Sequence, residues 1–227
     1  MPVQFVTMRL LTLLVVLSAQ AATAPLAQAV PTASPPPSDA RPSLGLAEAM
    51  AQLRRQNFAG ALAAASRAGP VARDIIEWHR LRVGLGDFDE VVDFTTRNPD
   101  WPGMTYLKQQ AEGSVPRSGR APDVIAFFSD TQPRTGDGTV ALVMAFRELG
   151  ADGDAEAEAA LAWLERSMTA EAERVLLSLY PDILTPLNEA RLDSMLWDGA
   201  TQAAQRAMAR VDADQQALAK ARMVLRS

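Results

Sequence analysis

The chain has 227 residues, with 22 Lys and Arg against 27 Asp and Glu, so its net charge at pH 7 is −5. An acidic chain is poorly suited to nucleic acid, whose phosphates need a basic surface, and to electrostatic docking on anionic lipid. It has no cysteine and one histidine, His79, which excludes thiol nucleophiles, iron–sulfur clusters, cysteine zinc sites and two-histidine metal sites.

An N-terminal signal peptide is predicted over residues 1–29. Arg9 is its only charged residue, and the apolar core that follows over residues 10–17 is too short to span a bilayer as a helix. Pairs of small residues follow at three sites between residues 19 and 29, as signal cleavage requires. We expect a mature chain outside the cytoplasm with no transmembrane helix; an uncleaved membrane anchor is the alternative.

Residues 30–43 are rich in proline and serine and predict an extended linker between the signal and a folded domain. The domain over residues 44–227 has a helical pattern dominated by alanine, leucine, glutamate and arginine, with no stretch that alternates like a strand. Glu171 and Glu173 lie in the first turn of one helix, where they favour its dipole. The predicted helices are Leu44–Arg55, Phe58–Ala68, Val71–Val83, Phe88–Arg97, Met104–Glu112, Pro122–Phe128, Thr139–Leu149, Asp154–Arg166, Ala170–Leu179, Leu187–Leu196, Thr201–Val211 and Ala213–Leu225.

Four turns share one pattern: a helix, a Gly/Asp turn, and a second helix that begins with small and acidic residues. This pattern is typical of the helix hairpins of a solenoid. Their glycines lie 26, 64 and 49 residues apart, so a strict tetratricopeptide period fails and an irregular α-solenoid, or superhelix, of tetratricopeptide-like hairpins is predicted. A globular helical bundle is the alternative. The four turns are 57–62, 85–90, 149–156 and 196–200.

The densest group of reactive residue types is Glu77, Trp78, His79 and Arg80. All four lie on one predicted helix, where neighbours point about 100° apart, so they cannot form a joint site without a partner from another helix. We expect Trp78 to pack and His79 to be partly exposed. No residue is assigned a catalytic role on this basis.

An alternating acidic run over Asp152, Asp154, Glu156 and Glu158 could indicate calcium, but Gly153 is misplaced for an EF-hand loop. An acidic helix N-terminus is the better interpretation. A glycosidase would need two carboxylates across a cleft, and 27 acidic residues do not single out a pair. No phosphate loop, dinucleotide fingerprint, serine elbow or zincin motif occurs, so no cofactor or metal is expected.

The four tryptophans could stack on sugar rings, but each is expected to anchor two helices, because a tryptophan buries a large apolar area. They are Trp78, Trp101, Trp163 and Trp197.

The segments 72–82, 86–88, 97–102 and 188–199 resemble the N-terminal helical arm of soluble lytic murein transglycosylases of Gram-negative bacteria. The Asn-Pro-Asp-Trp-Pro turn at 98–102 and the Glu-Ala-Arg-Leu-Asp stretch within the last segment carry most of the likeness, which covers residues 44–227. The resemblance implies a periplasmic role in peptidoglycan turnover, in which an α-superhelix guides glycan strands to a separate lysozyme-like domain.

That lysozyme-like domain carries the family's catalytic glutamate in a Glu-Ser pair, followed by Gly-Leu-Met-Gln, and neither string occurs here. No catalytic residue can therefore be carried over, and we expect residues 44–227 to be a truncated superhelical domain that does not cleave glycan by itself. Two alternatives stay open. One is a periplasmic tetratricopeptide-like scaffold that binds other cell-wall or envelope proteins; the other is a small glycan hydrolase with an unrecognised carboxylate pair.

Overall fold

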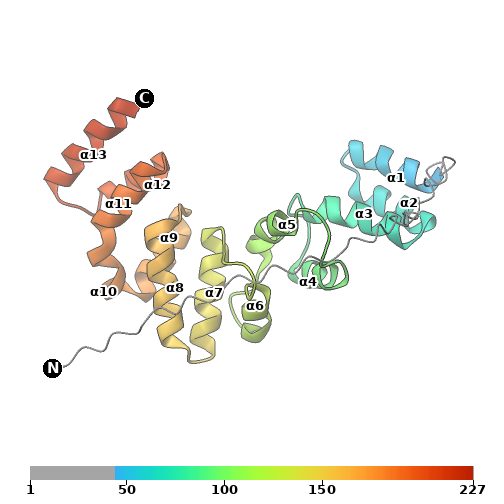
Figure 1. Ribbon diagram of the computed structural model, residues 1–227, viewed down its shortest axis with the longest axis horizontal. Helices are drawn as coiled ribbons and strands as arrows, with labels where there is room; N and C mark the ends of the chain where they lie inside the picture. The colour runs from blue at the N-terminus through green and yellow to red at the C-terminus, as the bar shows by residue number, and fades with distance from the viewer. Residues whose placement is uncertain (1–43, 227) are drawn as a thin grey trace, which may run out of the picture. The chain divides into compact units, whose positions relative to one another are not determined.

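The computed structural model describes residues 44–226 and is all-helical over that range, which confirms the predicted all-α class. The expected signal peptide at 1–29 and the Pro-rich linker at 30–43 lie outside the described residues. Figure 1 labels the helices in chain order. They are α1 Leu44–Arg54, α2 Phe58–Ala68, α3 Pro70–Leu81, α4 Phe88–Arg97, α5 Met104–Ala111, α6 Ala121–Phe127, α7 Gly136–Glu148, α8 Asp152–Glu165, α9 Ala170–Leu179, α10 Pro181–Leu184, α11 Asn188–Trp197, α12 Thr201–Met208 and α13 Ala213–Arg226.

Most helices that follow one another in the sequence pack together. The most extensive packing is between α1 and α2, α7 and α8, α2 and α3, and α11 and α12, and α8 also packs against α11. A helix junction lies at each of the four predicted turns. Asn57 caps α2 and Asp87 caps α4, the latter in a capping box with Glu90. The turns after α7 and α11 use Gly150 and Gly199 at φ of 72° and 71°, a conformation that glycine adopts without strain.

The buried apolar side chains of residues 44–226 form four clusters along the chain rather than one central core. Helix α7 takes part in two of them. Ala141, Leu142 and Ala145 pack toward α4, α5 and α6, whereas Val140 and Val143 pack toward α8 and α9. Because α7 is apolar almost all round, as a helix buried on both sides must be, it joins the two clusters.

Two elements differ from the sequence prediction. Helix α7 begins at Gly136, whereas Thr135–Gly138 was expected to be a glycine-rich loop, and α10 with the following 3-10 turn Thr185–Leu187 was not predicted. The early start of α7 has a local cause, since the Thr135 hydroxyl accepts a hydrogen bond from the amide of Gly138 at 3.1 Å. A distant residue, Glu112, holds that threonine in place, and a window of local sequence does not show it.

Candidate functional site

The four reactive residues Glu77 to Arg80 all lie on α3, but they contact different partners. Glu77 is buried and lies 3.3 Å from Arg97 of α4, while Arg80 bonds Glu90 at 2.6 Å. His79 rests edge-on against Trp78, and burial followed by the nearby Arg82 cation lowers its pKa. Glu77 and Arg80 are therefore engaged with α4 rather than with His79, and the four residues do not form a shared site on α3.

Trp78 instead connects two of the segments on which the family resemblance depends. Its indole nitrogen donates a hydrogen bond of 3.0 Å to the carbonyl of Pro102, and its ring lies 6.3 Å from that of Trp101. The guanidinium of Arg82 lies 4.4 Å from the Trp78 ring and 5.2 Å from that of Tyr106 on α5. The 98–102 turn is thus held on the end of α3 by aromatic packing, as we expected for Trp78.

The other residues considered as candidates in the sequence, the acidic run and the remaining tryptophans, do not form a site. Asp152 and Asp154 are exposed in the first turn of α8, and Glu158 on the same helix is buried against Arg166 at 2.5 Å. Trp163 is fully buried, but Trp197 is 73% exposed, so the packing predicted for Trp197 was wrong. Across residues 44–226 no group of three or more histidine, cysteine, aspartate or glutamate side chains is placed to hold a metal ion.

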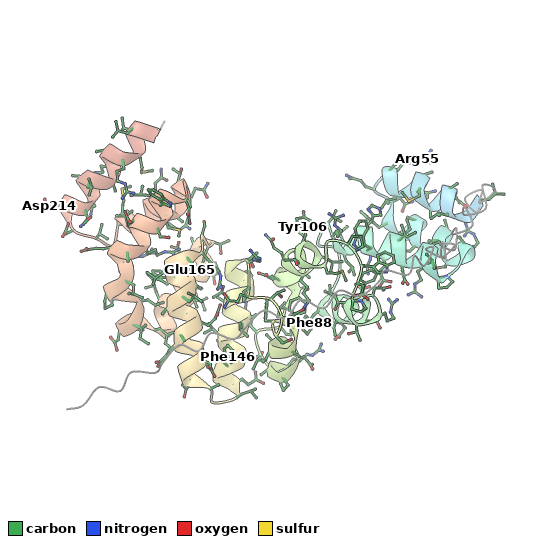
Figure 2. The ribbon with its side chains drawn as sticks, in the orientation of Figure 1. Arg55, Phe88, Tyr106, Phe146, Glu165 and Asp214 are labelled. Atoms are coloured by element: carbon green, nitrogen blue, oxygen red, sulfur yellow. The ribbon has the colours of Figure 1, made fainter. Side chains whose placement is uncertain are left out.

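The structure offers a site where the sequence showed none: two hollows that meet at Asp130. The first, of about 410 Å³, lies between α4, α5 and α6. The second, of about 710 Å³, lies between α5, the α6–α7 loop and the end of α8. Both volumes are in the range of small-ligand sites. Tyr106 on α5 and Glu165 on α8, labelled in Figure 2, mark the two helices that bound the second hollow.

The first hollow has a mixed apolar and polar lining and contains one half-buried cation, Lys108. Val92, Met104 and Phe127 contribute to its wall. The ammonium of Lys108 donates one hydrogen bond to the Asp130 carboxylate at 2.6 Å and another to the backbone carbonyl of Phe127 at 3.2 Å. The hydrogen bond from Lys108 lowers the pKa of the Asp130 carboxyl, so this carboxyl stays ionised and anchors the rim that the two hollows share.

The second hollow is lined by polar groups of several kinds: hydroxyls from Thr105, Thr131 and Ser167, the Gln132 amide, the carboxylates of Asp130 and Glu165, and the guanidinium groups of Arg134 and Arg166. Arg166 is held in place, because its guanidinium donates hydrogen bonds to the Glu158 carboxylate, to the Thr139 hydroxyl at 3.3 Å and to the side-chain amide oxygen of Gln132 at 3.0 Å. The exposed guanidinium of Arg134 has no ion-pair partner among the described residues.

Glu112 fixes the loop that carries these groups. Its carboxylate accepts the amides of Arg134 and Thr135 at 2.7 and 2.6 Å and the Thr135 hydroxyl at 2.5 Å. Burial raises the pKa of Glu112, and the hydrogen bonds from Thr135 and Arg134 oppose that rise. The polar lining is therefore held by a buried carboxylate and does not depend on the loop alone.

Sequence reasoning missed Lys108, Asp130, Arg134 and Arg166 as lining residues. A usable signal was present, since two turn-rich stretches interrupt the helical pattern on either side of α6, at 113–121 and 129–135. Loops on a rigid helical scaffold are where binding groups tend to lie, but the partners of those loops come from α5 and α8.

No protein-family model, no curated protein and no solved structure matches this chain. Over residues 44–226, none of the helices combines the length and the apolar character needed to cross a membrane. The chemistry of the hollows is therefore the basis for a functional conclusion.

Proposed function

We propose that this chain is the helical arm of a periplasmic lytic transglycosylase-like protein that binds or guides peptidoglycan strands without cleaving them by itself. The observation that carries the proposal is the pair of adjoining hollows, the first lined by apolar and polar side chains together and the second by hydroxyl, amide, carboxylate and guanidinium groups. Sugar rings present apolar faces and rims of hydroxyl groups, and peptidoglycan adds amides and carboxylates, so such a lining is complementary to it.

The proposal includes a fold finer than all-α: an irregular α-solenoid of tetratricopeptide-like hairpins. Three features support it. Neighbouring helices pack in sequence order, glycines at positive φ close the turns after α7 and α11, and the buried apolar residues divide into clusters along the chain. A stack of this kind offers a long surface suited to a polymer.

The packing of the resembling segments is also consistent with the proposal. The segments 72–82 and 97–102, which carry part of the resemblance, contact each other through Trp78, Trp101 and Pro102. Periplasmic location follows from the predicted signal peptide and is part of the proposal.

The proposal is tested by a pull-down of the purified full chain with insoluble peptidoglycan, with analysis of the supernatant for anhydro-muropeptides. We expect saturable binding without anhydro products. Arg134→Ala should weaken binding roughly tenfold, about 1.4 kcal/mol, because it removes a charged donor from the second hollow. Arg55→Ala is the matched control: Arg55 is an exposed arginine beyond the end of α1, labelled in Figure 2, and its loss should leave binding unchanged.

A protein-binding scaffold is the second candidate, favoured by exposed apolar side chains. Leu218 and Leu225 on α13 are 55% and 86% exposed, and Leu85 is 53% exposed. Apolar groups exposed together on a helix commonly mark a surface for a partner. Absence of peptidoglycan binding by the wild-type chain would contradict the glycan proposal and leave the scaffold as the better explanation, whereas anhydro products would show that the chain is catalytic.

A further inference from the structure

A second polar centre lies among α8, α9, α11 and α12, and the proposed function does not use it. The buried Glu173 carboxylate accepts hydrogen bonds from three arginines: Arg191 at 2.8 Å, Arg206 at 3.0 Å and Arg210 at 3.0 Å. Arg191 and Glu173 are both fully buried. We call these three arginines with Glu173 the arginine cluster.

The cluster carries more positive than negative charge. Three guanidinium groups stay protonated at neutral pH and meet one carboxylate, so the excess is two charges. Backbone carbonyls at the end of α8 and in the turn after it also accept from the cluster: those of Trp163 and Arg166 from Arg191, and that of Met168 from Arg206. These acceptors are neutral, so they leave the net charge of the cluster unchanged. Among the described residues, no other carboxylate is paired with these arginines.

The cluster also holds several hydrogen-bond donors that have no protein acceptor. They are Nε of Arg191, Nη1 of Arg210 and the indole nitrogen of Trp163, all of them buried. Arg191 and Arg210 lie 4.3 and 5.5 Å from the Trp163 ring. Buried donors in proteins are nearly always satisfied, so three such donors in one place, with excess positive charge, indicate an acceptor supplied from outside the chain.

The cluster is open on one side. Arg191 is fully buried, but the side chains of Arg206 and Arg210 are 27% and 25% exposed. Arg206 uses Nε and Nη2 in its bonds to Glu173 and to the carbonyl of Met168, so its Nη1 is still available as a donor. An anion can therefore approach from solvent along these two side chains.

We propose that Arg206 and Arg210 bind a phosphate-class oxyanion at the open edge of the arginine cluster, with Arg191 and Trp163 behind them. A phosphate group carries nearly two negative charges at pH 7 and several acceptor oxygens, which match the excess charge and the spare donors. Guanidinium groups bind such oxyanions with paired hydrogen bonds. This site is separate from the two hollows and does not depend on glycan binding.

The test is calorimetric titration of the full chain with inorganic phosphate, at constant ionic strength maintained with chloride. We expect saturable binding by the wild type and at least tenfold weaker binding by Arg210→Gln. In that variant Arg191 and Arg206 still hold Glu173, so the fold should persist. Arg174→Gln on α9 is the matched control, because this exposed arginine pairs with Glu171 alone and its loss should leave phosphate binding intact.

Thermal unfolding in phosphate and in chloride gives a second readout. Phosphate stabilises many proteins non-specifically, so the diagnostic result is a rise in Tm that saturates in the wild type and is smaller in Arg210→Gln. A parallel titration with glycerol 3-phosphate distinguishes a free anion from a phosphate ester: binding of either supports the site and identifies the source. No saturable heat with either compound, or equal binding by wild type and Arg210→Gln, would overturn the proposal.

Discussion

Two buried glutamates, Glu112 and Glu173, fix distant parts of this chain by opposite electrostatic means. Glu112 is 3% exposed and accepts hydrogen bonds only from neutral groups, two backbone amides and a hydroxyl. Glu173 is fully buried and is surrounded by three guanidinium groups. Burial raises the pKa of Glu112, whereas for Glu173 the hydrogen bonds from the arginines outweigh the effect of burial and lower the pKa.

This difference shows what each carboxylate can be used for. Neutral donors fix the geometry of the loop at the second hollow without adding charge there, so Arg134 keeps an unpaired guanidinium. The guanidinium donors around Glu173 hold α9, α11 and α12 together but leave two positive charges in excess. The first arrangement positions a binding surface, and the second is itself a candidate binding site.

The largest effect is expected from removing Glu173. Glu173→Ala leaves three arginines close together with no counter-charge, and breaking a buried ion pair from one side typically costs about 3–5 kcal/mol of unfolding free energy. Urea unfolding followed by circular dichroism measures the loss. Glu171→Ala is the control on the same helical turn, where the exposed pair with Arg174 is screened by solvent and its loss should leave stability nearly unchanged. Equal losses in the two variants would show that the arginine cluster is not a stabilising centre.

A smaller loss of unfolding free energy is expected from removing Glu112. Glu112→Ala leaves the amides of Arg134 and Thr135 and the Thr135 hydroxyl without their acceptor, which should cost about 1–3 kcal/mol of unfolding free energy. The same variant should weaken peptidoglycan binding, because the loop that carries Arg134 loses its anchor. Glu156→Ala on the exposed face of α8 is the control for both measurements. Unchanged stability would mean that water replaces the carboxylate without cost.

Gly138 sharpens the comparison through a double-mutant cycle. A Cβ there would lie 2.7 Å from Cδ and 2.9 Å from Cγ of Glu112, so Gly138→Ala should destabilise the wild type by about 1 kcal/mol or more. In the Glu112→Ala background those atoms are gone, and alanine should stabilise α7 by about 1 kcal/mol through its higher helix propensity. The change of sign between the two backgrounds is the result to look for in urea unfolding. An equal effect of Gly138→Ala in the two backgrounds would mean that the Glu112 side chain does not contact position 138.

The sequence predicted the helices well because their signals are local. Asp87 with Glu90, and the glycines at 150 and 199, lie within a few residues of the helix ends that they define. It did not predict the two buried carboxylates, whose partners lie far along the chain. Glu173 is recognisable only as an acidic residue in a first turn, and its three arginines follow 18, 33 and 37 residues later.

The candidate hollows were unpredictable for the same reason. The polar lining of the second hollow comes from α5, the α6–α7 loop and the end of α8, and no single window of sequence contains it. Thr135–Gly138 illustrates the failure: two glycines indicate a loop locally, but the bonds from Thr135 to Glu112, 23 residues away, turn the segment into the start of α7. The exposure of Trp197 was likewise decided by the packing of α11 and not by its residue type.

The last test uses pH, where the two glutamates should act with opposite signs. A lowered pKa for Glu173 means that its stabilisation is fully present above its unfolded value, near 4.5, and is lost as pH falls through the lower folded value. A raised pKa for Glu112 means that its contribution is fully present below its unfolded value, also near 4.5, and declines as pH rises through the higher folded value.

Unfolding free energies of wild type, Glu173→Gln and Glu112→Gln between about pH 3 and 7 separate the two cases. The advantage of wild type over Glu173→Gln should grow as pH rises toward 4.5, and its advantage over Glu112→Gln should shrink as pH rises beyond 4.5. Glutamine keeps the side-chain shape and one acceptor oxygen, so the slope with pH, rather than the absolute loss, reports the charge. Slopes of the same sign would contradict the prediction, because they would mean that the pKa values of Glu112 and Glu173 shift in the same direction on folding.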